Sequence, residues 1–258
     1  MVDATVVAHR MSAPGGPSTI GGMWEQLRRV ARPDSRLHYD FAHMHPDFEG
    51  SNLAAEQAVA LKPMREATTV FTAPDNALLA LRQAVLASGK ILILSTYRMR
   101  RGFRMIDPRR ISPHDLAFAA TLDGMERLGT PIGLDLLASL GPVDVLATGA
   151  AAISKDGMRF GRGLGYFDIE WGLLAEMGLV RETTPIIAFV HDVQVVDEPI
   201  AASAREAVVD WIVTPTRSLH ITHRQRRPTG IDWPRLDPQE IEEMQALKEL
   251  QRAKGLRR

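Results

Sequence analysis

Short apolar runs and longer amphipathic segments alternate through the middle of the chain. The apolar runs have the length of buried strands and occupy residues 68–72, 91–95, 143–148, 186–190 and 211–214. They are continuous instead of alternating apolar and polar, which is typical of parallel strands covered on both faces. Segments with helical spacing separate them, at residues 75–88, 113–128, 166–178 and 202–208. This order predicts a three-layer, doubly wound α/β domain with a mostly parallel, Rossmann-like sheet.

The segments before the first strand have weaker patterns. Residues 1–20 mix Gly, Pro, Ser and Ala without a period, so we predict a flexible tail. A short amphipathic helix is predicted at residues 23–30, and Ser51 caps a second helix that runs to about residue 61. The loop between these helices holds three histidines: His38, His43 and His45. Their spacing, without a second cluster of ligands, is a weak metal signal, and we interpret the segment as a surface loop.

The last segment, residues 237–258, is predicted to form a C-terminal helix. Asp237 is in the capping position, Pro238 follows at the first helical position, and apolar side chains share one stripe. The stripe needs a partner surface, either on the same domain or on a second copy of the chain, so a homodimer stays open. We therefore expect a tail over residues 1–20, one α/β domain over residues 21–236 and a separate C-terminal helix.

Composition and charge narrow the functional classes. The 258 residues include 31 Lys and Arg and 31 Asp and Glu, so no net positive charge attracts nucleic acid or an anionic membrane. The chain has no Cys, which excludes disulfides, thiolate metal sites and Cys nucleophiles. Its apolar runs are much shorter than the roughly eighteen residues of a membrane span, and the N-terminus lacks a signal peptide's apolar core. We expect a soluble, cytoplasmic protein without a membrane partner.

The most informative stretch is DGMRFGRGLGYFDIEW, residues 156–171, between a predicted strand and a predicted helix. Three glycines alternate in it: Gly161, Gly163 and Gly165. Glycines let backbone N–H groups approach a ligand, the helix start adds partial positive charge, and Arg159 and Arg162 add full charges. The loop is therefore suited to phosphate. Asp168, in the first helical turn, either stabilises the helix N-terminus or binds the Mg²⁺ that accompanies ATP.

The whole stretch resembles the G-x-x-x-G-x-G-x-G-Y-x-D signature of the 5-formyltetrahydrofolate cyclo-ligase family, the methenyltetrahydrofolate synthetases. The matching residues are Gly157, Gly161, Gly163, Gly165, Tyr166 and Asp168. The continuation GYFDIEW and the segment VHDVQVVDE, residues 190–198, are closer to a divergent branch, the methenyltetrahydrofolate synthetase domain-containing proteins. The resemblance covers roughly residues 23–216 and is strongest from residue 143 onward.

The resemblance implies a Rossmann-like fold and an ATP-dependent ligase of folate and one-carbon metabolism. Such enzymes use Mg-ATP to phosphorylate the formyl oxygen of 5-formyltetrahydrofolate, and a neighbouring folate nitrogen then closes the ring. The resemblance also implies that the glycine loop holds the ATP phosphates, at Arg159, Gly161, Arg162, Gly163, Leu164, Gly165 and Tyr166. By the same resemblance, Asp168 binds Mg²⁺, and Arg162, Tyr166 and Asp168 are the catalytic residues.

Two segments depart from the family pattern. Cyclo-ligases carry a Lys and an Arg in an N-terminal K-x-x-x-R helix, and the corresponding segment here is MWEQLRRV. Arg28 or Arg29 would have to replace that lysine. The family's folate-contacting Glu, expected after the second strand, is missing, because no Glu occurs between Glu66 and Glu126. A basic loop, STYRMRRGFRMIDPRR, residues 95–110, occupies its place.

The basic loop carries six arginines: Arg98, Arg100, Arg101, Arg104, Arg109 and Arg110. It is interpreted either as a solvated rim or as a pocket for an anionic substrate group, which Arg binds in bidentate fashion. A patch for single-stranded nucleic acid is a third reading, against which the neutral net charge and the lack of an RNA-binding motif both count. We take Arg98 and Arg100 as candidate substrate-binding residues and do not expect nucleic acid as a partner.

His191 and Asp192 directly follow the predicted strand at residues 186–190, at the edge where α/β sheets bind ligands. On the pattern, His191 is a general base, a phosphate contact or an ordinary loop residue. Adjacent residues in an extended segment point in opposite directions, so the two side chains are not expected to pair with each other. Both are included as candidate substrate-binding residues.

These observations predict a cyclo-ligase-like enzyme that uses ATP and Mg²⁺. Its expected substrate is 5-formyltetrahydrofolate or a related, anionic small heterocycle. Two other functions stay open: a non-catalytic nucleotide- or RNA-binding module that retains the phosphate loop, and a repurposed enzyme of cofactor metabolism, for example one related to thiamine.

Overall fold

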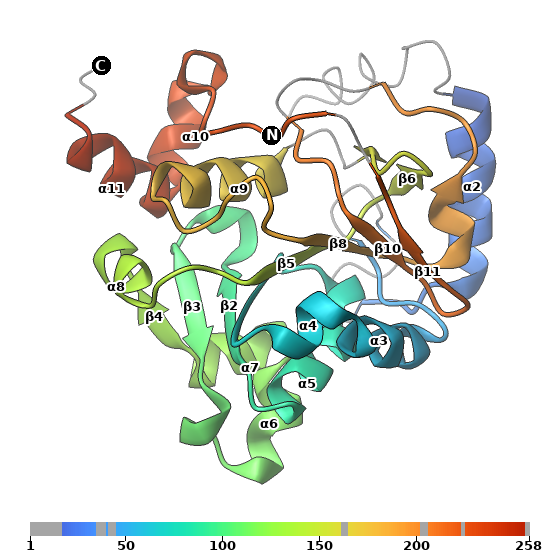
Figure 1. The fold of residues 1–258 in the computed structure, drawn as a ribbon, viewed down its shortest axis with the longest axis horizontal. Coiled ribbons are helices and arrows are strands. Elements are labelled where there is room, and N and C mark those ends of the chain that lie inside the picture. Colours follow the sequence, from blue (N-terminus) through green and yellow to red (C-terminus); the bar gives the residue numbers. More distant parts are fainter. Residues whose placement is uncertain are drawn as a thin grey trace.

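A computed structural model describes residues 17–34, 40, 45–160, 165–201, 206–222 and 225–255 of the chain. The strands of its main sheet are β1 (Thr69–Thr72), β2 (Ile91–Ser95), β3 (Phe103–Ile106), β4 (Thr130–Ile132), β5 (Val145–Thr148), β8 (Ile186–Phe189), β10 (Trp211–Val213) and β11 (Ser218–His220). They lie in the order β11-β10-β8-β5-β1-β2-β3-β4 (Figure 1). The five inner strands, from β10 to β2, are parallel, while β3, β4 and β11 join antiparallel at the edges. The predicted doubly wound, mostly parallel sheet is confirmed.

The parallel strands are those that the apolar runs predicted. Every residue of β1, β5 and β8 is buried, as expected for strands covered on both faces. Figure 1 shows helices on both sides of the sheet, with α3 (Ser51–Ala60), α4 (Lys62–Glu66) and α5 (Leu79–Ala87) on one face and α9 (Tyr166–Glu176) on the other. The sheet with its two helical layers makes the expected three-layer architecture.

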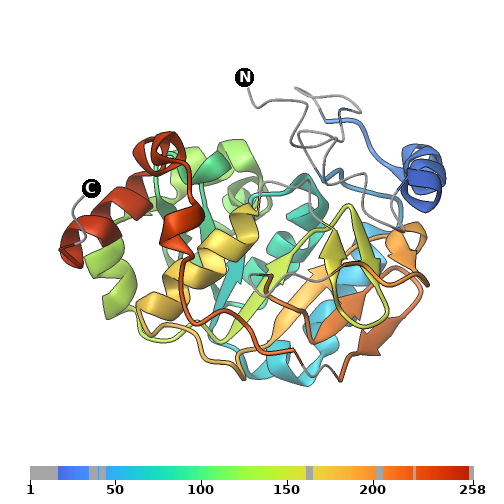
Figure 2. The ribbon, with the colours of Figure 1, turned by 90° about the horizontal axis from the view of Figure 1, so that it is seen from above.

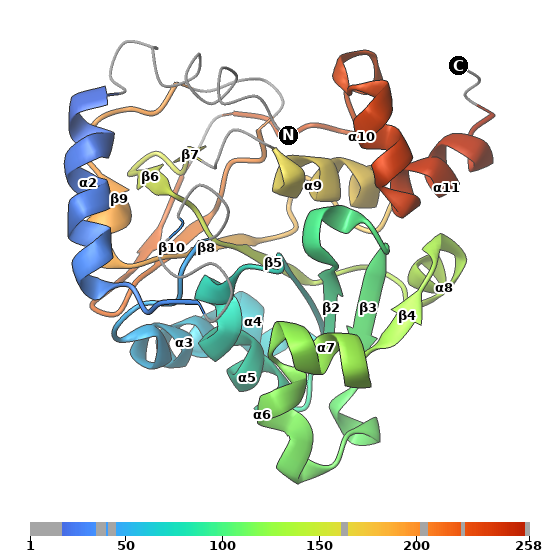
Figure 3. The ribbon, with the colours of Figure 1, turned by 180° about the vertical axis from the view of Figure 1, so that it is seen from behind.

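A second, smaller sheet stands beside the main one. It consists of β7 (Arg159–Phe160), β6 (Ala152–Ser154) and β9 (Val195–Val196), in that order. Helix α2 (Pro17–Val30) packs alongside it (Figure 3). Met23 and Leu27 of this helix form a separate small core with Ala152. The helix begins six residues earlier than predicted, so the expected tail over residues 1–20 is wrong from Pro17 onward. Pro suits a first turn, whereas the glycines at 21 and 22 obscured the helical pattern. Residues 1–16 lie outside the described part.

Two predicted helices differ in the structure. The expected helix at residues 113–128 is two helices, α6 (Leu116–Ala119) and α7 (Leu122–Leu128), because the Thr121 side chain caps α7 by accepting from the Gly124 amide. The expected helix at residues 202–208 is wrong at 206–208, which are not helical, while 202–205 lie outside the described residues. The Ala207 amide there bonds to a side chain on α9 instead of to a helical carbonyl.

The C-terminal segment forms two helices instead of one. Helix α10 (Pro238–Glu243) begins with the predicted cap at Asp237, and α11 (Gln245–Ala253) follows after a break at Met244, which has an extended backbone. Met244 and Leu247 are buried in the main core, so the apolar stripe is covered by this chain. Figure 2 shows both helices beside α9 and α8 (Leu134–Ser139), at the end of the molecule opposite α2.

The strand order reverses between β5 and β1, and this switch point is where doubly wound sheets bind ligands. His45 lies over it. A Cβ added to Gly149, just after β5, would be 3.2 Å from the His45 Cβ, and the His45 carbonyl accepts from the Ala77 amide at 3.0 Å. His45 is buried, so the expectation of a surface loop is wrong at this residue, whereas His38 and His43 lie outside the described residues. None of the described helices is long and apolar enough for a bilayer span.

Candidate functional site

Two glycines of the family signature have a left-handed backbone, one before α9 and one between β6 and β7. Gly165 has φ 62° and directly precedes the helix. Gly157, in the turn between β6 and β7, has φ 86°, and a Cβ there would lie only 2.7 Å from the Val209 carbonyl oxygen. A side chain is therefore excluded at Gly157 by both backbone strain and contact. The intervening candidates lie outside the described residues: Gly161, Arg162, Gly163 and Leu164.

Asp168 and Arg159, predicted respectively to bind metal and phosphate, lie together as an ion pair. The Asp168 Oδ1 accepts from Arg159 Nη2 at 2.6 Å and from the Ala207 amide at 2.9 Å. Both side chains are largely buried, and the guanidinium lies 4.6 Å from the centre of the Phe167 ring. Asp168 thus joins α9, β7 and the segment before β10. A Mg²⁺ ion at Asp168 would have to share the carboxylate with Arg159.

Tyr166 faces a different part of the molecule from Asp168, since residues two apart on a helix point to nearly opposite sides. Burial raises the pKa of the half-buried Tyr166 phenol, and the positive charge of Arg98 opposes this shift. Charged groups of Glu240 and Glu243, on α10, also act on the phenol. The structure therefore brings two predicted site residues, Tyr166 and Arg98, to one place, beside the C-terminal helices.

Most arginines of the basic loop are neutralised by carboxylates. Arg100 pairs with Glu243 at 3.1 Å, and Arg104 pairs with Glu126 at 3.0 Å. Two further pairs join Arg101 to Glu126 and Arg109 to Asp107. Arg100, a predicted substrate-binding residue, is thus exposed and already has a carboxylate partner on α10. These ion pairs remove much of the charge on which a nucleic-acid patch would depend.

Glu170 is a residue that the sequence reasoning did not select. It lies one turn after Tyr166 on α9 and is buried, and its Oε1 accepts from the Ser95 hydroxyl at 2.5 Å. Its Oε2 is buried and finds no hydrogen-bond partner in the described part of the chain. Burial raises the pKa of Glu170 to about 8, so the carboxyl is mostly protonated at pH 7. In the sequence, the one feature that could have indicated a buried Glu170 is its position between Ile169 and Trp171, inside an apolar stretch.

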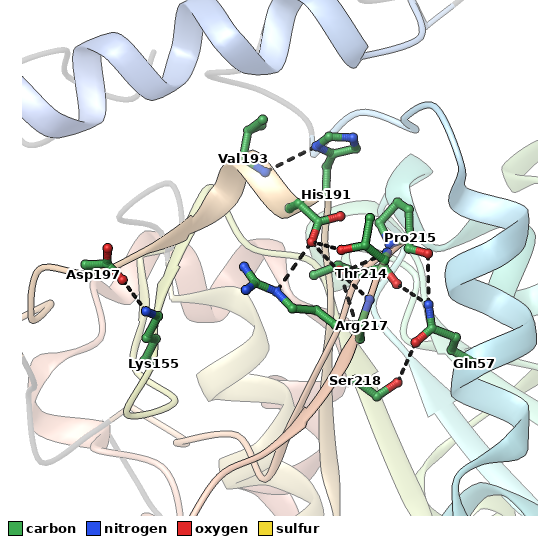
Figure 4. Close-up of polar contacts among 11 residues, drawn as sticks. Gln57, Lys155, His191, Val193, Asp197, Thr214, Pro215, Arg217 and Ser218 are labelled. Atoms are coloured by element: carbon green, nitrogen blue, oxygen red, sulfur yellow. Dashed lines mark hydrogen bonds and ion pairs between the residues drawn. The ribbon is translucent and has the colours of Figure 1, made fainter.

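His191 and Asp192 do not pair with each other, as predicted, and Figure 4 shows the His191 ring directed away from Thr214 and Arg217. The His191 Nδ1 accepts from the Val193 amide at 3.2 Å, and burial lowers the pKa of His191. The neutral ring therefore carries its proton on Nε2. His191 is thus suited to donate a hydrogen bond.

Asp192 fixes the turn after β10. Its Oδ1 accepts from Thr214 Oγ1 at 2.8 Å and from Thr216 Oγ1 at 2.5 Å, and lies 3.5 Å from Arg217 Nε. Gln57 on α3 donates to the Thr214 and Pro215 carbonyls from the other side (Figure 4). The Asp192 Oδ2 is buried, and none of the residues that the structure describes donates a hydrogen bond to it. These contacts give Asp192 a structural role, and any ligand contact would fall to Oδ2.

The predicted substrate residues fall into two groups. Arg98 follows β2 and His191 follows β8, and β1 and β5 lie between these strands. Three strand spacings separate the two strands by roughly 14 Å. A ligand would therefore have to extend along the carboxyl edge of the sheet to reach both.

Helix α2 lies beside the hairpin that leads into the glycine loop. Phe160, the last residue of β7 before Gly161, packs against the small core of α2. Arg28 and Arg29 are exposed on this helix. The arrangement keeps both arginines as candidates to replace the lysine of the family pattern.

The sequence model of the 5-formyltetrahydrofolate cyclo-ligase family matches residues 22–215. This chain belongs to that family. It is also 36% identical over 211 residues to methenyltetrahydrofolate synthase domain-containing proteins of Bos taurus and Homo sapiens, covering 81% of this chain and 55% and 54% of those proteins. The corresponding protein of Danio rerio is 33% identical over 208 residues, which cover 80% of this chain and 54% of that protein. The chain thus spans about half the length of these relatives.

Among solved structures, the NMR structure of 5,10-methenyltetrahydrofolate synthetase from Aquifex aeolicus is similar to this cyclo-ligase family member. The two chains share 16% identity over 78% of this chain and 92% of the other, with a TM-score of 0.44. That score is too low to support conclusions about individual residues.

The described residues fit Mg-ATP in part. Left-handed Gly165 allows close backbone approach at the start of α9, and Arg159, although paired with Asp168, is a cation fixed beside that start; both features suit a phosphate group. No group of three or more His, Asp or Glu side chains that could hold a metal ion occurs among the described residues.

Proposed function

We propose that this cyclo-ligase family member converts 5-formyltetrahydrofolate to 5,10-methenyltetrahydrofolate at the expense of ATP, or closes the same ring on a closely related heterocycle. One observation carries the proposal. The signature residues Gly165, Tyr166 and Asp168 form the start of α9, whose Glu170 bonds to Ser95 at the carboxyl end of β2, so this start lies at the carboxyl edge of the parallel sheet. That edge is where doubly wound sheets bind ligands.

The proposed reaction has two steps. The γ-phosphoryl group of ATP passes to the formyl oxygen, and ADP leaves. The neighbouring folate nitrogen then attacks the formyl carbon and loses its proton, while phosphate departs with the former formyl oxygen. Phosphoryl transfer requires positioning and charge neutralisation more than covalent help from the protein. Bound Mg²⁺ would neutralise part of the phosphate charge.

The chain's own residues have distinct proposed roles. The ATP phosphates bind to the backbone of the glycine loop and to Arg162, with Arg159 and Tyr166 at the start of α9. Arg159 is buried and tied to Asp168, so its charge is fixed in place before any ligand arrives. This preorganisation favours phosphate binding, since no side chain has to be ordered. Asp168 is proposed to share its carboxylate between Arg159 and Mg²⁺.

The remaining candidates are assigned to the second substrate. Arg98 and Tyr166 are proposed to contact it between β2 and α9, with Arg100 at the rim, and His191 and Asp192 to contact whichever ligand extends toward β8. The ion pairs of Arg100, Arg101 and Arg104 speak against the RNA-binding alternative, because paired arginines release fewer counterions on binding RNA.

The test is an assay of the purified chain with Mg-ATP and 5-formyltetrahydrofolate, following the absorbance of the methenyl product. Asp168→Asn should slow product formation. Asp135→Asn is the matched control, because Asp135 also stands in the first turn of a helix but is exposed and on α8. Binding of both ligands without product would favour a non-catalytic module. Product from another heterocycle alone would favour a repurposed enzyme.

A further inference from the structure

Two consecutive residues after β2 adopt a backbone conformation that side chains rarely accept. Arg98 and Met99 both have φ 54°, and they are the only non-glycine residues with positive φ in the described part of the chain. Neither is Asn or Asp, whose short polar side chains ease this conformation. Such strain persists where the surrounding structure enforces it, and it concentrates at functional sites.

The backbone around Thr96 enforces the strained turn. The Thr96 amide donates to the Gly102 carbonyl at 2.9 Å, and the Met99 amide donates to the Thr96 carbonyl at 2.7 Å. The Thr96 hydroxyl accepts from the Arg101 amide at 3.0 Å, and the Met99 side chain is fully buried. None of these contacts involves the Arg98 side chain. The backbone conformation at Arg98 is therefore held by its neighbours, and the Arg98 side chain does not contribute to holding it.

The Arg98 guanidinium is poorly satisfied in this position. Its Nε is buried and has no hydrogen-bond partner among the described residues, and its Cζ lies 5.5 Å from the centre of the Tyr97 ring. Arg100, Arg101 and Arg104 each pair with a carboxylate, whereas no ion pair is formed by Arg98 among the described residues. A buried, unpaired N–H group and a strained backbone are both unfavourable in the free protein.

Access from solvent is open on one side. Tyr97 is 46% exposed, so the ring against which Arg98 lies can meet a ligand. Burial raises the pKa of the Tyr166 phenol, at the start of α9, and the positive charge of Arg98 opposes this rise. The guanidinium thus lies against an exposed aromatic ring, and its charge acts on the helix that follows the glycine loop.

We propose that Arg98 is the anion-binding residue of this site and receives a phosphoryl or carboxylate oxygen of the bound ligand, with Tyr97 packing against the same group. Arg forms paired, charge-assisted hydrogen bonds with both anions, which would satisfy the unpartnered Nε. The inference rests on the proposed function in taking Mg-ATP and 5-formyltetrahydrofolate as the two ligands. Among the arginines of the basic loop it assigns anion binding to Arg98, whereas Arg100 pairs with Glu243 on α10 and Arg101 and Arg104 pair with Glu126 on α7.

The strained backbone makes Arg98→Gly an unusually clean test. Glycine accepts φ 54° freely, so the variant should keep or raise the melting temperature while it loses the guanidinium. Arg101→Ala is the matched control, since it removes a nearby exposed arginine that is already paired with Glu126. Calorimetric titrations with Mg-ATP and with 5-formyltetrahydrofolate, done separately, would measure both affinities for each protein.

We expect Arg98→Gly to weaken the binding of one ligand at least tenfold and Arg101→Ala to weaken both less than threefold. A loss confined to Mg-ATP identifies the anion as phosphoryl, and a loss confined to the folate identifies it as carboxylate. Affinities that match those of the native chain for both ligands, equal losses in the two variants, or no binding of either ligand to the native chain would each overturn the proposal. Absence of methenyl product from a chain that still shows the Arg98-dependent loss would reject the proposed reaction alone.

Discussion

The carboxyl group of Glu170 and the hydroxyl of Ser95 join α9 to the end of β2 through a 2.5 Å hydrogen bond inside the core. Four neighbours act on the Glu170 carboxyl besides burial. Ser95 and Arg159 favour its charged form, while the carboxylates of Asp75 and Asp168 disfavour it. Burial has the largest effect and raises the pKa of Glu170. The helix that carries the family signature therefore contains a buried carboxyl that is mostly neutral at pH 7.

Glu170 should make the stability of the protein depend on pH. Its pKa is about 8 in the folded chain against an ordinary value of 4.5, so the folded state holds the extra proton between these values. The free energy of unfolding should therefore fall as pH rises from about 4.5 to about 8, by up to about 5 kcal/mol, and level off above that. Urea unfolding of the native chain and of Glu170→Gln across this range measures the effect.

The Gln variant lacks the titrating group, so it should gain stability relative to the native chain as pH rises. Ser95→Ala provides the second comparison. It removes a bond that lowers the pKa of Glu170, and should extend the decline to higher pH. Parallel pH profiles for the native chain and Glu170→Gln would show that Glu170 is ionised at neutral pH, against this account.

The Asp168–Arg159 ion pair should show strong coupling in a double-mutant cycle. Asp168→Asn leaves a largely buried guanidinium without a charge partner, and we expect it to cost roughly 3 kcal/mol of unfolding free energy. Arg159→Met should be costly for the converse reason. The double variant should cost less than the sum by about 1–3 kcal/mol, measured by urea unfolding. Additive losses would mean that the two side chains stabilise the fold independently.

Gly157 and Gly141 provide a matched pair for the turn that leads into the glycine loop. Both have left-handed backbones, with φ 86° and 81°, but a Cβ at Gly141 would contact nothing within 4 Å, whereas one at Gly157 would meet the Val209 carbonyl at 2.7 Å. Gly141→Ala should cost about 1 kcal/mol from backbone strain alone. Gly157→Ala should lower the free energy of unfolding by at least about 1 kcal/mol more than Gly141→Ala, because of the contact with the Val209 carbonyl. Thermal unfolding of both variants measures the two losses, and equal losses would mean that this contact is unimportant.

The sequence predicted the parallel sheet because its strands are defined by local pattern. The continuous apolar runs at β1, β2, β5, β8 and β10 appear wherever a strand is buried on both faces. The short strands β6, β7 and β9 have two or three residues each and no pattern of their own. They exist because tertiary contacts hold them, for example the bond between the Val209 amide and the Gly157 carbonyl.

The candidate site shows the same division. The sequence identified Tyr166, Asp168 and Arg98 as candidate site residues, but the residues that they contact lie far away along the chain. Asp168 binds the amide of Ala207, 39 residues later, and this long-range contact replaces the helix that the local pattern predicted there. Glu170 was missed because nothing in a single sequence distinguishes a neutral buried carboxyl from an exposed charge on a helix.

The central claim is that this chain couples ATP cleavage to ring closure, and the most direct test measures both products in one reaction. ADP release and methenyl absorbance should be followed together in purified chain supplied with Mg-ATP and 5-formyltetrahydrofolate. The account predicts one ADP for each methenyl product, and a common decrease in both for Asp168→Asn. ADP release that is independent of the folate, or neither product from a chain that binds both ligands, would contradict it.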